Sequence, residues 1–273
     1  MKVSEIMTPE PITIDADTDL EEAMDLMEVQ DVRHLPVIRN DWVAGILSDR
    51  DLMEATGWPT ARGSGDASGK STARTVSEVM HQPVSTVSPD DSILTVSSSL
   101  ILRKIGCLPV VEEGHLVGIV TERDVMKLYG PSWKDSLLSG DVDPFVERHM
   151  TPNALTVERT TPLAEAVSRC ALAGIRHLPV MDGETLVGMV SDRDLKKAKG
   201  AGVPDETAVE EIMTPFTVRV APRDGLSKAA KIMLESRISA LPVLEGDRLV
   251  GILTSTDVLH HCIDCLRPRA SSS

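Results

Sequence analysis

The sequence predicts an α+β protein built from four tandem repeats, each with the element order β-α-β-β-α. The first observation is a short motif, Gly-apolar-apolar-[Ser/Thr]-x-x-Asp, which occurs four times. The second is its context, because a Leu-Pro-Val precedes each glycine and a methionine opens each copy. The third is the register, since this methionine precedes the leucine by 28 residues and the last aspartate by 44 residues in every copy. The motifs span residues 45–51, 118–124, 188–194 and 251–257.

Differences in length are confined to the joints between copies. The distance from the last aspartate of one copy to the methionine of the next falls from 29 to 26 to 19 residues. This pattern is typical of packed units joined by surface loops. We therefore place the repeats at 1–56, 75–128, 146–199 and 209–265. Between and after them lie a flexible Gly-, Ser- and Thr-rich linker at 57–74, an aromatic-containing linker at 129–145, a linker at 200–208 and a tail at 266–273.

Local patterns predict the elements of the first copy. Residues 11–15 are β-branched and flanked by turn residues, which predicts a strand. Residues 17–28 have apolar side chains at helical spacing and acids in the first turn, which predicts a helix. Residues 34–38 and 42–47 are predicted to form a hairpin around an Asn-Asp turn. A second helix is expected to begin at Ser48, and the other copies repeat this order.

Composition limits the class of protein. The net charge of −14 argues against a broad surface for nucleic acid or acidic membranes, because phosphate groups require clustered Lys and Arg. Aromatic residues make up 2% of the chain, so the cores must be aliphatic. The four cysteines are scattered, which favours reduced thiols. The first residues lack the apolar stretch of a signal peptide, and no apolar run reaches membrane-spanning length. We therefore expect a soluble cytoplasmic protein.

The repeated residues resemble the cystathionine-β-synthase (CBS) domain family. The resemblance rests on Met-Thr-Pro at Met7, Met150 and Met213, on the Leu-Pro-Val strand and on the Ser/Thr-x-x-Asp ending. It covers nearly the whole chain apart from the joints and the tail. It implies that consecutive copies pair through their sheets into Bateman modules, here copies one and two, then copies three and four. It also implies a cleft for adenine nucleotides at each pair interface.

The resemblance further implies which side chains meet a ligand. In the family, the hydroxyl residue and the aspartate of the ending contact phosphate and ribose. A threonine of the first strand and its apolar neighbour line the adenine pocket, and basic residues before Leu-Pro reach the phosphates. With the arginines that precede the aspartates, the candidate nucleotide-binding residues are Thr13, Ile14, Arg33, His34, Ser48, Arg50, Asp51, Thr86, Val87, Thr121, Arg123, Asp124, Thr156, Val157, Arg176, His177, Ser191, Arg193 and Asp194.

The Ser/Thr-x-x-Asp ending has two interpretations. It is a near relative of a helix capping box, which would explain the hydroxyl and the acid without a ligand. Capping does not explain Arg50, Arg123 and Arg193, which place a cation in the first helical turn where the helix dipole disfavours it. A phosphate at the helix N-terminus would reverse that preference. An acid for ribose beside an arginine for phosphate therefore favours nucleotide binding in copies one to three.

The copies are not equivalent. Copy four has Thr256 in place of the arginine and Arg219 in place of the first-strand threonine, so capping alone suffices there. Arg-His precedes Leu-Pro in copies one and three, whereas copy two has Gly106 and copy four has Ser239 at the arginine position. The basic pairs either reach ligand phosphates or are solvated or ion-paired side chains at a strand start.

Two further patterns are weaker. Residues 64–71 resemble a phosphate-binding Walker loop, but its first glycine is replaced by Ser64 and no strand precedes it, so a linker is favoured. Cys262 and Cys265 form a single Cys-x-x-Cys without a second pair, which is a weak signal for metal binding or redox chemistry. We assign no catalytic and no metal-binding residue.

The sequence thus predicts a regulatory protein rather than an enzyme. It would bind AMP, ADP or ATP in its clefts and signal to a partner protein by a conformational change. The modules would associate as a disc within one chain or in a homodimer, without nucleic acid or membrane. The alternatives are a scaffold with empty clefts, or a binder of another adenosyl ligand such as S-adenosylmethionine, although the cationic residues favour phosphorylated ligands.

Overall fold

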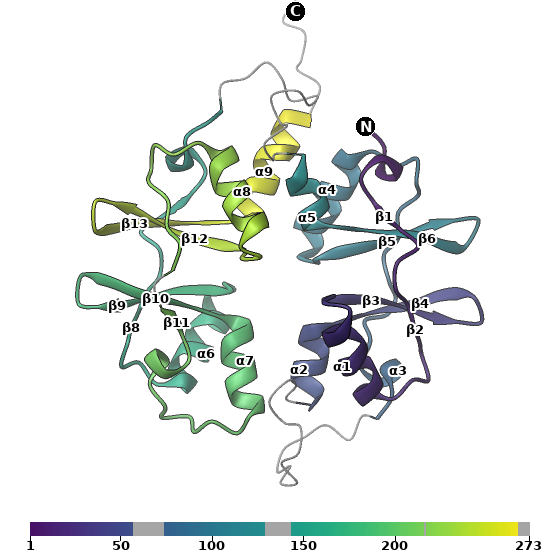
Figure 1. Cartoon of the computed structure of the whole chain (residues 1–273), viewed down its shortest axis with the longest axis horizontal. Helices are drawn as coiled ribbons and strands as arrows, with labels where there is room; N and C mark the ends of the chain where they lie inside the picture. Colours follow the sequence, from purple (N-terminus) through teal and green to yellow (C-terminus); the bar gives the residue numbers. More distant parts are fainter. Residues whose placement is uncertain (57–73, 129–142, 216, 267–273) are drawn as a thin grey trace, which may run out of the picture.

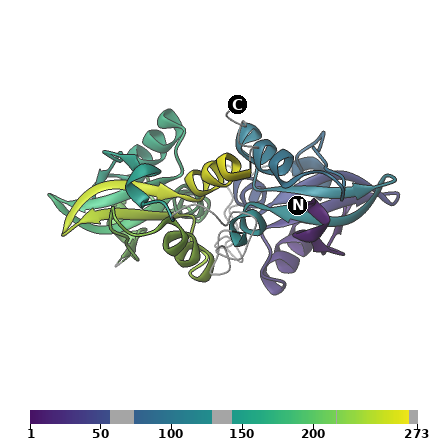
Figure 2. The ribbon, with the colours of Figure 1, turned by 90° about the horizontal axis from the view of Figure 1, so that it is seen from above.

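The computed structural model describes residues 1–56, 74–128, 143–215 and 217–266. Most of the linkers predicted at 57–74 and 129–145, the Walker-like segment and most of the tail therefore lie outside the described residues. Repeats 1 and 2 form one module and repeats 3 and 4 the other, and the two modules lie side by side in a disc (Figure 1). Seen from above, they are two lobes with α9 at their junction (Figure 2).

Repeat 1 confirms the predicted element order. The first helix begins after Asp19, whose carboxylate accepts a hydrogen bond from the Glu21 N–H, and the hairpin turns at Asn40 and Asp41, both with positive φ. The first strand is shorter than predicted, because only its last two residues pair with the middle strand. The elements are β2 (Ile14–Asp15), α1 (Leu20–Val29), β3 (His34–Arg39), β4 (Trp42–Ser48) and α2 (Asp49–Thr56).

The other repeats have the same plan. In repeats 2 and 4 the first strand is reduced to one parallel bridge, Val87 with Val110 and Val220 with Val243. Repeat 2 contains α3 (Val76–Val79), α4 (Ile93–Arg103), β5 (Cys107–Glu112), β6 (His115–Thr121) and α5 (Glu122–Lys127). Repeat 3 contains β8 (Val157–Glu158), α6 (Leu163–Ala173), β9 (His177–Asp182), β10 (Thr185–Ser191) and α7 (Asp192–Gly200). Repeat 4 contains α8 (Leu226–Glu235), β12 (Ala240–Glu245), β13 (Arg248–Thr254) and α9 (Ser255–Leu266).

The repeats of a module exchange their first segments, which the sequence analysis did not predict. The Thr-Pro of the Met-Thr-Pro motif is a short strand in the sheet of the partner repeat. β1 (Thr8–Pro9) pairs with β6, β7 (Thr151–Pro152) pairs with β13, and β11 (Thr214–Pro215) pairs with β10. In the remaining case His81 forms a bridge with Ile46.

This exchange explains the fixed methionine and the fixed glycine of the motif. The methionine side chain of each repeat packs where the glycine of its partner repeat lacks a side chain. A Cβ atom at Gly118 would lie 2.6 Å from the sulfur of Met7, and one at Gly188 would lie 2.5 Å from the sulfur of Met213. Met80 and Met150 approach Gly45 and Gly251 in the same way. The two motif elements are therefore the two sides of one contact between repeats.

The two ends of the disc are held together differently. Repeats 2 and 4 share one continuous apolar core that includes Leu100 of α4 and Leu259 of α9. Repeats 1 and 3 have separate cores and meet through α2 and α7. Cys107, Cys170 and Cys262 are buried free thiols, and Cys265 is half-buried. Among the described residues, no helix combines the length and apolar character needed to cross a membrane.

Candidate functional site

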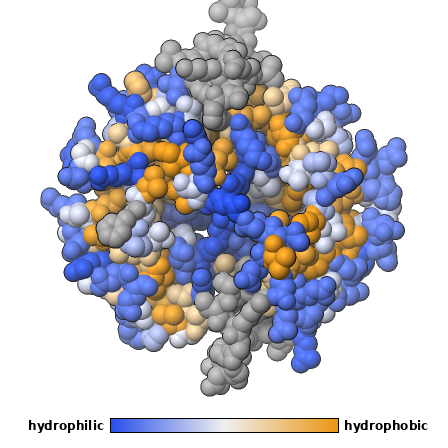
Figure 3. Space-filling model, in the orientation of Figure 1, coloured by the Kyte–Doolittle hydropathy of each residue, from blue (hydrophilic) through white to orange (hydrophobic). Residues whose placement is uncertain are grey.

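A cavity of about 940 Å³ lies where the four repeats meet, and all four contribute to its wall. Figure 3 shows a hollow at the centre of this face with hydrophilic residues around it. The odd repeats, 1 and 3, supply the residues at the starts of β3 and β9 and the first turns of α2 and α7. The even repeats supply the ends of α4 and α8 and the starts of α5 and α9. The cavity therefore depends on both modules of the chain.

The wall of the cavity is cationic although the chain as a whole is acidic. Eight Lys and Arg residues and five Asp and Glu residues line it, whereas the whole chain has a net charge of −14. Basic groups are thus concentrated where the modules meet. The basic residues are Arg33, Arg50, Lys104, Arg123, Lys127, Arg176, Arg193 and Arg237, and the acidic residues are Glu10, Asp31, Asp49, Glu122 and Asp124.

The three motif arginines cross from one module to the other. Arg193 Nη2 lies 2.6 Å from Asp49 Oδ2, and Arg50 Nε lies 3.8 Å from Asp192 Oδ2. Arg123 donates a hydrogen bond to the Leu234 carbonyl at 2.8 Å. These contacts give the arginines a structural role that does not require a ligand. Our argument that capping leaves them unexplained considered only their own helix, and the structure corrects it.

These contacts do not satisfy the arginines fully. The Nε atoms of Arg50 and Arg193 are buried, and each lacks a hydrogen-bond partner among the described residues. Burial, followed by repulsion from neighbouring arginines, lowers the pKa of Arg50, and the same two causes lower the pKa of Arg33. The cavity therefore holds positive charges that repel one another and that an anion would stabilise.

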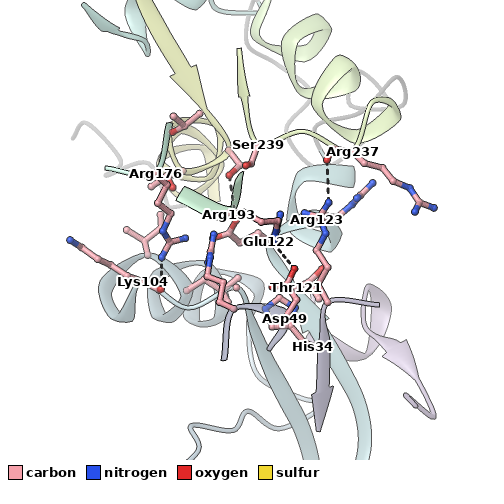
Figure 4. A pocket seen from close by; sticks show the side chains of 18 of the residues that line it. His34, Asp49, Lys104, Thr121, Glu122, Arg123, Arg176, Arg193, Arg237 and Ser239 are labelled. Carbon is pink, nitrogen blue, oxygen red and sulfur yellow. Dashed lines mark hydrogen bonds and ion pairs between the residues drawn. The ribbon is translucent and has the colours of Figure 1, made fainter. Parts of the chain in front are cut away.

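The Arg-His pairs of the odd repeats reach into the same space. Arg33 donates to the Arg237 carbonyl at 3.4 Å, and Arg176 donates to the Lys104 carbonyl at 3.1 Å, the latter drawn as a dashed line in Figure 4. Each arginine thus contacts the diagonally opposite repeat in the other module, at the end of its helix. The Arg33 side chain remains exposed and that of Arg176 is half-buried, so both interpretations of these pairs stay open.

The two histidines pack on small residues of the partner repeat. The ring nitrogen Nε2 of His177 lies 3.0 Å from Ser239 Oγ. A Cβ at Gly106, the position equivalent to Ser239, would lie 2.9 Å from Nε2 of His34. Burial lowers the pKa of each imidazole to about 4, with neighbouring arginines adding to the effect. Both rings are therefore neutral near pH 7.

The motif aspartate has the geometry of a helix cap in all four repeats. One carboxylate oxygen accepts hydrogen bonds from both the N–H and the hydroxyl of the motif Ser or Thr, at 2.6–2.9 Å. The reciprocal capping bond, from the aspartate N–H to the motif hydroxyl, is present in repeats 1 to 3 at 3.3–3.4 Å, which confirms the capping interpretation for those repeats. In repeat 2 the aspartate also faces the cavity, and its second oxygen lies 2.7 Å from Lys127 Nζ. In repeat 1 the second oxygen of Asp51 lies 3.2 Å from His81 Nδ1.

The structure brings about half of the predicted ligand-binding residues to the cavity. Ile14, Val87 and Val157 instead lie in hydrophobic cores, because the first strand runs against the middle strand and turns these side chains inward. The predicted residues at the cavity are Arg33, His34, Arg50, Thr121, Arg123, Asp124, Arg176, His177 and Arg193. Those elsewhere are Thr13, Ile14, Ser48, Asp51, Thr86, Val87, Thr156, Val157, Ser191 and Asp194.

Several cavity residues were missed by the sequence analysis. Pro11 and Ile12 of repeat 1 lie at the cavity with Thr121 and Asp124 of repeat 2. The exchanged strand β1 explains this, because it carries the start of repeat 1 onto the sheet of repeat 2. Leu155 of repeat 3 reaches the cavity beside repeat 4 in the same way. The signal was the recurring Met-Thr-Pro, which we assigned to the repeat that contains it.

Comparison with known proteins gives a consistent family assignment. The CBS domain family matches residues 3–57, 76–130, 145–200 and 209–264. Protein MJ1225 of Methanocaldococcus jannaschii is 26% identical over 271 residues, covering 92% of this chain and 94% of that protein. MJ1404 of the same organism is 27% identical, and the match covers 96% of this chain but only 62% of that protein.

Two solved structures share the fold. The crystal structure of MJ1225, described there as a candidate archaeal homologue of γ-AMPK, has a TM-score of 0.75 at 23% identity and covers 96% of this chain and 99% of that one. A conserved protein of Pyrococcus horikoshii has a TM-score of 0.65 at 24% identity and covers 96% and 100%. The chain therefore belongs to the CBS domain family, with four tandem CBS domains paired into two Bateman modules.

Proposed function

We propose that this protein is a regulatory binder of adenine nucleotides, and that the nucleotide phosphates occupy the central cavity. The observation that carries the proposal is the concentration of eight Lys and Arg residues around one cavity in an acidic chain. Guanidinium groups bind phosphate through paired N–H donors, and Arg50 and Arg193 each have a donor without a hydrogen-bond partner. Phosphate would relieve both the missing hydrogen bonds and the repulsion between cations.

The cleft of repeat 2 offers the groups that a nucleoside needs. Asp124 can accept hydrogen bonds from ribose hydroxyls through the oxygen that now faces Lys127. Pro11, Ile12 and Ile119 supply an apolar wall for a base on the same side of the cavity. Pockets that bind small molecules typically combine such an apolar lining with a few well-placed polar groups. Base, ribose and phosphate thus each have matching partners around one space.

The cleft of repeat 4 opens into the same cavity but offers weaker chemistry. Thr254 and Ile252 correspond to Thr121 and Ile119, and Leu155 takes part in the wall. Thr256 stands where the other repeats have an arginine. We therefore place the primary nucleotide in the cleft of repeat 2, with its phosphates among the arginines that both modules provide.

The proposed output of binding is a change in how the modules pack, read by a partner protein. The cavity wall comes from both modules, so a ligand there contacts both. A ligand shifts a conformational equilibrium only through its differential affinity for the two states. Membership of a family of regulatory domains, with CBS domains over most of the chain, supports regulation rather than catalysis.

Isothermal titration calorimetry of ligand-stripped protein tests the proposal. AMP, ADP and ATP should bind, whereas adenosine, which lacks phosphate, and S-adenosylmethionine should bind much more weakly. Asp124→Asn should weaken nucleotide binding about tenfold to a hundredfold, because hydrogen bonds to a charged group contribute about 1.5–3 kcal/mol.

Asp51→Asn is the matched control. Asp51 accepts the same two capping hydrogen bonds but does not line the cavity. The Oδ1 atom of an asparagine at this position can still accept the capping hydrogen bonds, so both variants should remain folded. An equal loss of affinity in both variants would move the site away from the cavity. The absence of binding by any of the three nucleotides would overturn the proposed function.

A further inference from the structure

The two ends of the disc differ in the kind of contact that holds them. At one end, α4 and α5 of repeat 2 pack on α8 and α9 of repeat 4 within a single apolar core. At the other end, repeats 1 and 3 keep separate cores, and α2 meets α7 through ion pairs. These pairs are Arg193 with Asp49, Arg50 with Asp192, and Lys196 with Glu54. An apolar core resists separation, whereas ion pairs can be exchanged for others.

The two arginine pairs are reciprocal. Asp49 and Arg50 occupy the same motif positions as Asp192 and Arg193, so each repeat provides one acid and one arginine to the other. The Asp49 side chain is only 9% exposed, and both members of its pair line the cavity. The carboxylate of Asp49 thus occupies part of the space in which we place a ligand phosphate.

A phosphate cannot use Arg193 fully while this arrangement holds. Asp49 takes the Nη2 donor, and the Nε donor is buried within the contact. Two-point binding of a phosphate would require the side chain to move, and that movement would separate it from Asp49. A terminal phosphate also carries a charge of about −1.5 to −2 near pH 7, which would repel the adjacent carboxylate. Asp192 lies outside the cavity wall and 3.8 Å from Arg50 Nε, so it holds Arg50 by charge attraction rather than by a hydrogen bond.

We propose that Asp49 and Asp192 compete with the ligand phosphate for Arg193 and Arg50, so that nucleotide binding releases α2 from α7 and opens the disc at repeats 1 and 3. The core shared by repeats 2 and 4 then acts as the hinge. This inference rests on the proposed function, because it assumes that phosphate enters the central cavity. Coupling is reciprocal, so weakening the contact between α2 and α7 must strengthen phosphate binding.

The first test is a charge-neutral replacement of the two competitors. The double variant Asp49→Asn with Asp192→Asn keeps the size and an acceptor oxygen of each side chain. ATP, measured by calorimetry, should bind about five- to twentyfold more tightly to it than to the wild type. The control is Asp182→Asn with Asp205→Asn, which changes the net charge equally but removes ion pairs to Arg159 and Lys199 that lie outside the cavity wall.

The possible outcomes distinguish this inference from the proposed function on which it rests. Tighter binding beyond the control supports competition. Affinity equal to the control, or weaker than the wild type, would overturn it while leaving the nucleotide site in place. If ATP bound neither the wild type nor the double variant, the proposed function itself would fail.

A distance measurement tests the opening directly. Spin labels at Glu22→Cys in α1 and Lys199→Cys in α7, which take no part in the ion pairs between α2 and α7, report the separation of repeats 1 and 3. Labels at Leu102→Cys and Asp264→Cys report that of α4 and α9. Both pairs are placed in a Cys265→Ser chain, since the other native cysteines are buried. Saturating ATP should lengthen the first distance and leave the second unchanged. An unchanged first distance, or equal lengthening of both, would refute a hinge at repeats 2 and 4.

Discussion

Gly118→Ala is a direct test of the contact that joins repeats 1 and 2. The new Cβ would lie 2.6 Å from the sulfur and 3.2 Å from Cγ of Met7, and 3.1 Å from the Thr8 carbonyl oxygen. Favourable contacts between heavy atoms lie near 3.5–4.0 Å, so the overlap with the Met7 side chain is about 1 Å. Overpacking of this kind costs about 1–3 kcal/mol.

The backbone itself does not oppose this substitution. Gly118 does not have a positive φ, so alanine can adopt its conformation. Replacing glycine by alanine at such a position also restricts the unfolded chain, which stabilises the protein by about 0.4–1 kcal/mol. The free energy of unfolding should therefore fall by a net amount of about 0–2.6 kcal/mol.

A double-mutant cycle identifies the cause. Met7→Ala removes both side-chain atoms in the overlap, so Gly118→Ala should be tolerated in its presence. The coupling free energy in urea denaturation, followed by circular dichroism, should be about 1–2 kcal/mol. Additivity of the two substitutions within about 0.5 kcal/mol would refute the reasoning.

Gly251 provides the control. A Cβ there would lie 2.6 Å from the Thr151 carbonyl oxygen, which is backbone, and 2.9 Å from the sulfur of Met150. Met150→Ala should therefore fail to rescue Gly251→Ala, because the backbone overlap remains. Rescue in both modules would show that the measured coupling does not report the contact described here.

Two further predictions concern stability. The pKa of about 4 for His34 and His177 lies below the unfolded value of about 6.5, so their contribution is fully present above pH 6.5 and is lost as the pH falls from 6.5 to 4. Both rings are half-buried at the cavity, so the loss of stability is at most about 3 kcal/mol per ring. The double variant His34→Gln with His177→Gln should therefore show a weaker pH dependence of urea unfolding between pH 7 and pH 5. An equally steep dependence in the variant would contradict this prediction. Leu100→Ala should lower the free energy of unfolding by about 2–5 kcal/mol. Because Leu100 lies in the core that repeats 2 and 4 share, this variant should broaden or shift the calorimetric unfolding of both modules, whereas Leu35→Ala should act mainly on repeat 1. Identical calorimetric profiles for the two variants would argue against a shared core.

The sequence was sufficient for the plan of each repeat because local patterns specify local elements. The spacing around Leu20, Ala23, Met24 and Met27 predicts α1, and all four side chains are buried. The exchanged strands could not be predicted in the same way. The separation between the methionine and the glycine of one repeat is the same in all four copies. The spacing is therefore equally consistent with Met7 packing on Gly45 of its own repeat or on the glycine of the partner repeat.

The sequence predicted those residues of the candidate site whose properties can be judged within a single helix or strand. Arg50, Arg123 and Arg193 were singled out because a cation in a first helical turn is unfavourable, and all three do line the cavity. Their partners lie in the other module, at Asp49, Asp192 and Leu234. Sequence spacing contains no information about which side chains meet across an interface between the helices of two modules.

The structure explains why the residues before Leu-Pro alternate between odd and even repeats. His34 fills the space above Gly106, and His177 hydrogen-bonds with Ser239, so a large residue in each odd repeat meets a small one in its even partner. The same alternation directs the basic side chains of the odd repeats into the centre. Because Arg50 and Arg193 hold the modules together and also form the cavity wall, an anion that binds them acts on the packing of the modules through the same atoms.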